Sequence, residues 1–131
     1  MKKTIKFGDK EVECVCNALT PFLYTEIFNK DFLTNMTSFM KFQNKKASEY
    51  TAEDLAFVSK RTNMFAEVAF VFAKQGEESD VNKLVNLSKT DFYTWLSGIN
   101  DARAFSQGET LKDIIDLWLG NAETITESKN A

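Results

Sequence analysis

The fold of this chain is decided by the stretch Thr20-Pro21-Phe22-Leu23-Tyr24-Thr25-Glu26-Ile27-Phe28-Asn29-Lys30-Asp31-Phe32-Leu33. Pro21 suits the first turn of a helix, where its missing N–H has no intrahelical partner to lose. Thr20 can cap that turn by accepting a hydrogen bond from the backbone N–H of N2 or N3. Large apolar residues then recur every three or four positions, as on one face of a helix. The stretch therefore predicts a helix over residues 21–29.

A second helix is expected directly after the first. Asn29 and Asp31 interrupt the apolar face, and Asp31 can cap a helix over residues 31–43. Phe32, Phe39 and Met40 would lie on the apolar face of that helix.

The residues before this stretch have the pattern of a β-hairpin. Residues 2–7 alternate polar and apolar side chains, Gly8-Asp9-Lys10 is a turn sequence, and the alternation resumes in residues 11–17. Cys14 and Cys16 would face the same side as small apolar residues. Because an isolated hairpin is only marginally stable, this hairpin over residues 2–17 must pack on helices.

The longest helix is expected over residues 52–75, with Thr51 as its cap and an end near Gly76. It should be the most buried element, because its apolar side chains cover much of its circumference. The predicted core positions on this helix are Leu55, Val58, Phe65, Ala69 and Phe72. Glu67 interrupts the apolar run and is expected on an exposed polar strip, or paired with Lys60, Arg61 or Lys74.

Two further helices complete the predicted fold. Ser88 caps a helix over residues 89–97, and Thr110 caps one over residues 110–119 that ends at Gly120. The fold class is therefore α+β and mainly α, an N-terminal β-hairpin packed on a bundle of about five helices. Residues 1–121 form a single globular domain, and the polar residues 122–131 form a flexible C-terminal tail.

Composition limits the function classes. The chain has 131 residues, twelve of them phenylalanine, and a net charge of −3. Residues up to Lys46 carry eight lysines and five acidic residues (+3), while residues from Ala47 onward carry eight basic and fourteen acidic residues (−6). Neither part has the dense basic patch of a nucleic-acid-binding protein, so no nucleic-acid partner is expected. Surplus aromatic residues and uneven charge suit a protein partner instead.

Candidate catalytic and metal-binding groups are few. Histidine is absent, and Cys14 and Cys16 lack the second ligand pair of a zinc site. Asp113 and Asp116, with Glu109 one turn earlier, are expected on a solvated helix face. We therefore expect no enzyme activity, cofactor or metal. The sequence has no candidate secretion signal or membrane span, and its cysteine usage favours the cytoplasm.

One basic and aromatic cluster remains before residue 51. Three lysines alternate there with three aromatic residues, as they do in single-strand-binding proteins. Because the cluster is short and the protein is acidic, a solvated helix end is the better interpretation. The cluster consists of Phe39, Lys41, Phe42, Lys45, Lys46 and Tyr50.

The order of these motifs resembles the tail assembly chaperones of long-tailed (siphovirus-type) phages and prophages of Gram-positive bacteria. The resemblance covers most of the chain and includes Phe7-Gly8-Asp9-Lys10-Glu11, Phe92-Tyr93-Thr94-Trp95-Leu96 and Leu117-Trp118. Many family members have Gly-Arg-Asp where this chain has Asn29-Lys30-Asp31. The helix-start motif of the family corresponds here to Tyr24, Phe28, Asp31, Phe32 and Leu33.

This resemblance implies a non-catalytic protein that covers the tape-measure protein in the host bacterial cytoplasm and helps recruit tail-tube subunits. It also implies a longer frameshifted form, and Ser128-Lys129-Asn130 is compatible with a slippery heptamer in the gene. Phe92, Trp95 and Trp118 are the candidate partner-binding residues, because tryptophan and other aromatics dominate interface energetics. Each of the three is equally well explained as a core residue.

Two other functions stay open at this point. The chain can be a prophage-encoded regulatory or adaptor protein that acts through protein contacts. It can also be a small enzyme that uses carboxylates or lysine. A homo-oligomer is compatible with all three functions.

Overall fold

The computed structural model describes residues 1–37, 39–42 and 45–120. The chain begins with an antiparallel hairpin of β1 (Lys2–Phe7) and β2 (Lys10–Val15), whose register runs from Lys2↔Val15 to Phe7↔Lys10. Gly8 has a φ of +66° in the turn, a conformation that glycine adopts without strain. The predicted hairpin is confirmed, whereas the expected tail over residues 122–131 lies outside the described residues.

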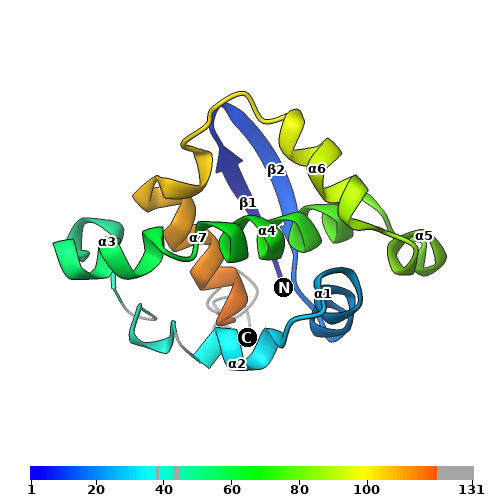
Figure 1. The fold of residues 1–131 in the computed structure, drawn as a ribbon, viewed down its shortest axis with the longest axis horizontal. Helices are drawn as coiled ribbons and strands as arrows, with labels where there is room; N and C mark the ends of the chain where they lie inside the picture. Colours follow the sequence, from blue (N-terminus) through cyan, green and yellow to red (C-terminus); the bar gives the residue numbers. More distant parts are fainter. Residues whose placement is uncertain (38, 43–44, 121–131) are drawn as a thin grey trace, which may run out of the picture.

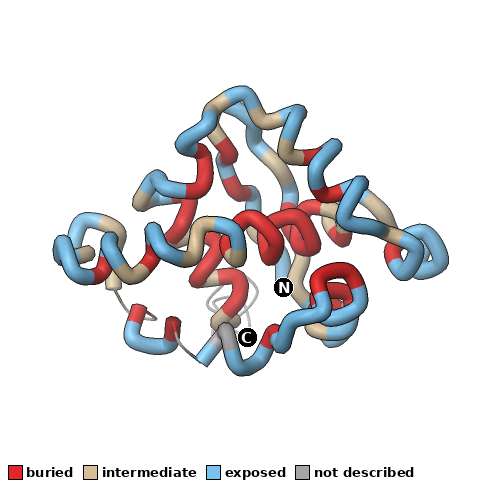
Figure 2. Tube along the Cα trace, viewed as in Figure 1, coloured by how far each residue is buried: buried red, intermediate tan, exposed pale blue. Residues whose placement is uncertain are grey.

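Helix α4 (Thr62–Glu77) is the centre of the molecule (Figure 1). Strand β2 lies along it, and α7 (Gly108–Trp118) packs on both β1 and α4. Every residue from 65 to 73 is buried, so this part of α4 is covered on all sides (Figure 2). A helix that is apolar around most of its circumference is typical of such a buried position.

The remaining helices surround α4 and the hairpin (Figure 1). Helices α1 and α6 both pack directly on α4. Their bounds are α1 Thr20–Phe28, α2 Phe32–Thr37, α3 Ala52–Ser59, α5 Val81–Val85 and α6 Lys89–Ser97, with short 3₁₀ turns at Met40–Phe42, Ala47–Glu49 and Ala104–Ser106. The α+β, mainly α fold with an N-terminal hairpin is therefore confirmed.

The single helix predicted over residues 52–75 is in fact two helices, α3 and α4. The prediction of one continuous helix is therefore wrong. The backbone leaves the helical region at Arg61, where φ is −119° and ψ is 23°. The Arg61 side chain donates a hydrogen bond from Nη1 to the Phe57 carbonyl oxygen at 2.8 Å, which satisfies one free carbonyl of the ending helix.

The break between α3 and α4 leaves part of the predicted apolar stripe exposed. Val58, Phe65, Ala69 and Phe72 are buried as predicted. Leu55 is 45% exposed, because α3 no longer continues the direction of α4 and its stripe is not covered along its whole length.

The helix predicted over residues 31–43 is also shorter than expected. Asp31 caps α2 as predicted, since its Oδ1 accepts the N–H groups of Leu33 at 3.0 Å and Thr34 at 3.3 Å. The helix ends at Thr37, whose hydroxyl donates to the Thr34 carbonyl oxygen at 2.8 Å. Such a bond back to the preceding turn competes with continued helical hydrogen bonding.

Of the other predicted caps, two are confirmed and two are wrong. Thr51 and Ser88 each accept the N3 backbone N–H in a capping box. Thr20 and Thr110 lie inside their helices and make no cap. Instead, the Thr20 hydroxyl donates to the buried Gln75 Oε1, and the Thr110 hydroxyl donates to a carbonyl of β1 at 2.7 Å. Both threonines therefore join distant elements to one another.

Candidate protein-binding surface around helix α3

The three aromatic residues expected to contact a partner lie in the core. Phe92, Trp95 and Trp118 are only 6%, 9% and 3% exposed. The Trp95 ring packs edge-on against Phe7 and Phe70, with centroid distances of 5.5 Å and 5.7 Å. The core interpretation therefore describes their positions: Trp95 joins the hairpin and α6 to the central helix, while Phe92 and Trp118 also contact phenylalanines of α4. A partner cannot reach them while this core stays packed.

The family-like motif also builds the core. Tyr24, Phe28 and Phe32 are buried, and the Tyr24 ring lies 5.4 Å from Phe28 and 5.7 Å from Phe32 between centroids. The Thr34 hydroxyl donates to Asp31 and lowers the pKa of this exposed carboxyl. Leu33 is different, because 57% of its surface is exposed.

Glu67 is buried and not on the exposed strip that we expected. It is only 8% exposed, and its Oε1 accepts a hydrogen bond from the Tyr24 hydroxyl at 3.1 Å. Lys30 Nζ lies 2.9 Å from Oε2, so the cation that pairs with Glu67 comes from the loop after α1. None of the three cations considered from the sequence has this role. Long-range pairing of this kind leaves no signal in local spacing.

Two carboxylates of α7, Asp113 and Asp116, are half-buried and not fully solvated. Asp116 pairs with Lys112 at 2.6 Å, and Asp113 lies 3.7 Å from Lys3 of the hairpin. Burial raises the pKa of the Asp113 carboxyl, while Lys3 opposes this effect. Glu109 is exposed. No group of three or more potential metal ligands occurs within the described residues.

The cysteine pair has the packing predicted for it. Cys14 is fully buried and Cys16 is half-buried, and both are free thiols. Burial raises the pKa of the Cys14 thiol to about 12 and also raises the pKa of Cys16. Both groups are therefore neutral thiols at physiological pH, and thiolate is the reactive form of cysteine.

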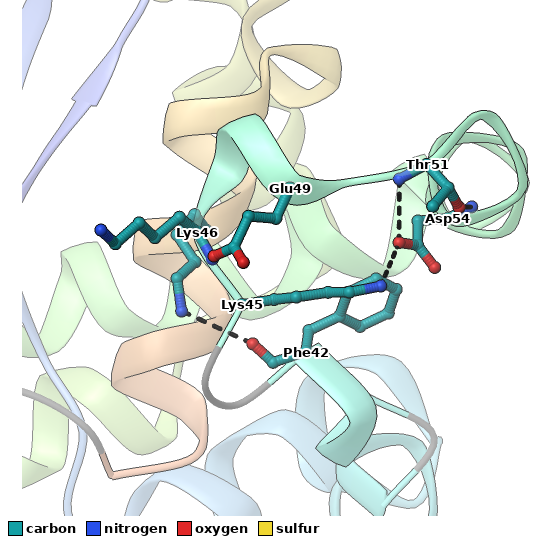
Figure 3. A network of polar contacts seen from close by, with 7 residues as sticks. Phe42, Lys45, Lys46, Glu49, Thr51 and Asp54 are labelled. Carbon is teal, nitrogen blue, oxygen red and sulfur yellow. Dashed lines mark hydrogen bonds and ion pairs between the residues drawn. The ribbon is translucent and has the colours of Figure 1, made fainter.

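A polar network holds α3 against the segment before it (Figure 3). Lys45 Nζ lies 2.6 Å from Asp54 Oδ2, which also accepts the Thr51 N–H at 3.0 Å. The hydrogen bond from Lys45 lowers the pKa of Asp54. Glu49 closes the turn between these residues by accepting the Lys46 N–H at 2.8 Å. The start of α3 is thus fixed by bonds from a neighbouring loop as well as by its own cap.

Part of the basic and aromatic cluster contacts residues of α3. Lys41 Nζ lies 4.1 Å from the centroid of the Phe57 ring, and Arg61 Cζ lies 3.8 Å from the same centroid. The expected solvated helix end is therefore only partly correct, since Lys41 contacts an aromatic ring and Lys45 pairs with a carboxylate. The contact of Arg61 with the Phe57 ring was not predicted from the sequence, although Phe57 and Arg61 have the i,i+4 spacing of helical neighbours.

Two hollows flank α3 and share Ala56, and we call them together the α3 surface. The first, of about 280 Å³, is mainly apolar and is lined by Leu55, Ala56, Val58, Ser59, Ser106 and Leu111. The second, of about 460 Å³, is mainly polar, with three basic and two acidic residues, and is lined by Lys41, Glu53, Asp54, Ala56, Phe57, Lys60 and Arg61. Apolar and charged recognition are therefore available side by side.

No helix among the residues described is long and apolar enough to span a bilayer. No protein-family model, curated protein or solved structure matches this chain.

Proposed function

We propose that this chain is a non-catalytic tail assembly chaperone of a long-tailed phage or prophage. It covers the tape-measure protein in the host cytoplasm and helps recruit tail-tube subunits. The observation that carries this proposal is the arrangement of the segment over residues 20–33, which also carries the sequence resemblance. Its inner side chains build the core, while Phe22 and Leu33 are 71% and 57% exposed.

Exposed apolar side chains on other elements support the same function. Met40, Leu55 and Tyr93 are 54%, 45% and 64% exposed, and each comes from a different part of the chain. Aromatic residues and methionine are enriched where proteins contact partners. A long apolar tape-measure helix needs such side chains to cover it until tube subunits assemble around it.

Co-expression with the tape-measure protein encoded in the same genome tests the proposal. We expect the tape-measure protein to remain soluble and to co-purify with this chain. Phe22→Ser combined with Leu33→Ser should reduce recovery, whereas Glu26→Ser, at an exposed polar position of α1, should not. Absence of a complex with both the tape-measure and tail-tube proteins would contradict the proposal.

Gene order provides a second check. A tail-tube gene upstream and a tape-measure gene downstream support an assembly chaperone. Neighbouring repressor or integrase genes, without tail genes, would favour a regulatory or adaptor protein instead.

A further inference from the structure

We propose that the α3 surface binds an amphipathic helix of a partner protein that carries carboxylates beside its apolar stripe. This inference rests on the proposed chaperone function and states where a partner segment docks and what chemistry it has. It follows from three features of the surface: an exposed leucine, a fixed arginine and an excess of positive charge.

The apolar part of the surface is centred on Leu55. This residue is 45% exposed, although its spacing places it on the stripe that continues into the core of α4. Beside it, Val58 and Leu111 are each only 1% exposed and belong to the apolar lining of the smaller hollow. A leucine or isoleucine side chain that enters this hollow would contact Leu55 and these core residues, and would remove apolar surface from water.

The charged part is centred on Arg61, whose guanidinium group is held in place. It stacks on the Phe57 ring at 3.8 Å and donates one hydrogen bond to the Phe57 carbonyl at 2.8 Å. Arg61 makes no ion pair within residues 1–37, 39–42 and 45–120. A planar guanidinium with free N–H groups and a fixed position is suited to bind a carboxylate through two hydrogen bonds.

The balance of charge favours an acidic partner. In the larger hollow, Lys41 and Lys60 also lack an ion pair in the described part of the chain, while Asp54 is already paired with Lys45. Glu53 is the remaining acidic residue of the lining, so positive charge is in excess. The carboxylate of Glu53 would repel a run of phosphates, and the neighbouring apolar hollow has no use for one. A polypeptide that carries both carboxylates and apolar side chains is therefore favoured over a nucleic acid.

The two hollows lie on either side of one small residue of α3. They meet at Ala56, a small residue that allows a partner backbone to approach α3 closely. Residues three or four apart on a helix lie on the same face, about 5–6 Å apart at Cβ. A partner helix that crosses α3 at Ala56 can therefore direct an apolar residue toward one hollow and a glutamate toward the other.

The direct test uses a fluorescein-labelled synthetic peptide with a leucine stripe flanked by glutamates. A length of about 20 residues exceeds the ~12–15 residues below which isolated helices are marginal in water. We expect binding to the full chain that weakens with added salt. Arg61→Glu and Lys60→Glu should each weaken binding by at least about tenfold, as expected when one partner of a close charge pair is reversed.

Matched variants separate binding from folding. Lys89→Glu reverses an exposed lysine on α6 and should change the affinity by less than about twofold. Because Arg61 also contacts Phe57, its variant can lose stability. Lys60→Glu is the variant that decides in that case, since Lys60 is exposed and makes no ion pair within the described residues. Circular dichroism confirms that each variant is folded.

Several outcomes would overturn the inference. These are absence of peptide binding, equal binding of a peptide with lysine in place of glutamate, and no effect of Lys60→Glu. Tighter binding of a single-stranded oligonucleotide at this surface would indicate a nucleic-acid site instead. A dimer that Lys60→Glu dissociates would show that a second copy of the chain is the occupant.

A parallel experiment distinguishes this inference from the proposed function. If the tape-measure protein co-purifies equally with wild type and with Lys60→Glu, the chaperone function stands and the docking site is wrong. If the acidic peptide binds as expected but neither the tape-measure protein nor the tail-tube protein co-purifies, the docking chemistry stands and the proposed function is wrong.

Discussion

A side chain on Gly76 of α4 would overlap the carbonyl oxygen of Glu13 on β2. The hairpin lies against the C-terminal part of α4 at this point, and only a residue without a Cβ allows that approach. Glycine inside a helix loses stability relative to alanine, so it needs a compensating contact. Here the compensation is the packing of the hairpin on the central helix.

Gly76→Ala should therefore be strongly destabilising. The added methyl group must displace backbone atoms of β2, and overpacking of this kind costs about 1–3 kcal/mol or more. Gly98→Ala is the matched control, because a Cβ there would lie 3.4 Å from the nearest atom and φ is −83°. Urea unfolding should show a large loss for Gly76→Ala and little change for Gly98→Ala. Equal effects would contradict the close packing of β2 on α4.

Removal of the two buried tyrosine hydroxyls should have different effects on the free energy of unfolding. Tyr24 donates to the buried Glu67, so Tyr24→Phe should cost about 1–2 kcal/mol of unfolding free energy. The Tyr50 hydroxyl has no hydrogen-bond partner among the described residues. Tyr50→Phe should therefore be neutral or slightly stabilising, since it removes a buried polar atom without breaking a bond. Thermal denaturation measures both, and a larger loss for Tyr50→Phe would reverse this assignment.

Alkaline pH should weaken the fold through Cys14. Burial raises the pKa of this thiol from 9.0 to about 12 in the folded state. Between these values the unfolded chain loses the proton while the folded chain retains it, so stability is full below pH 9.0 and falls as pH rises toward about 12. The limiting slope for one group is about 1.4 kcal/mol per pH unit.

Urea unfolding over this pH range measures the slope. Cys14→Ala should flatten it, although it also changes stability at neutral pH by leaving a small cavity. Tyr50, whose pKa burial likewise raises to about 12, adds a contribution of the same sign that the Cys14→Ala chain retains. An unchanged slope in Cys14→Ala would show that the thiol does not titrate differently in the two states.

The hairpin, the order of the helices and most core positions could be predicted from local pattern. Alternation gave β1 and β2, and Asp31, Thr51 and Ser88 gave helix starts, because a cap uses only residues within one turn. The break at Arg61 could not be predicted, since the apolar spacing continues through it.

The polar contacts that shape the candidate site were less accessible from sequence. Glu67 was expected in solvent. Instead, it accepts a hydrogen bond from Tyr24 and forms an ion pair with Lys30, both from a segment about forty residues earlier. Thr20 and Thr110 were expected as caps, but each bonds to a distant element. Local spacing carries no information about partners that tertiary packing alone brings near.

The apolar stripe over α3 and α4 leads to the last prediction. Phe72 is fully buried, and Phe72→Ala should cost about 3–5 kcal/mol through lost burial and the cavity left behind. Leu55 belongs to the same stripe by spacing but is 45% exposed, so Leu55→Ala should cost less than about 1 kcal/mol. Urea unfolding of the isolated chain separates the two. If Leu55→Ala matched Phe72→Ala, Leu55 would be a core residue and could not contact a partner. A small loss of stability together with weaker peptide binding is the result expected of a docking residue.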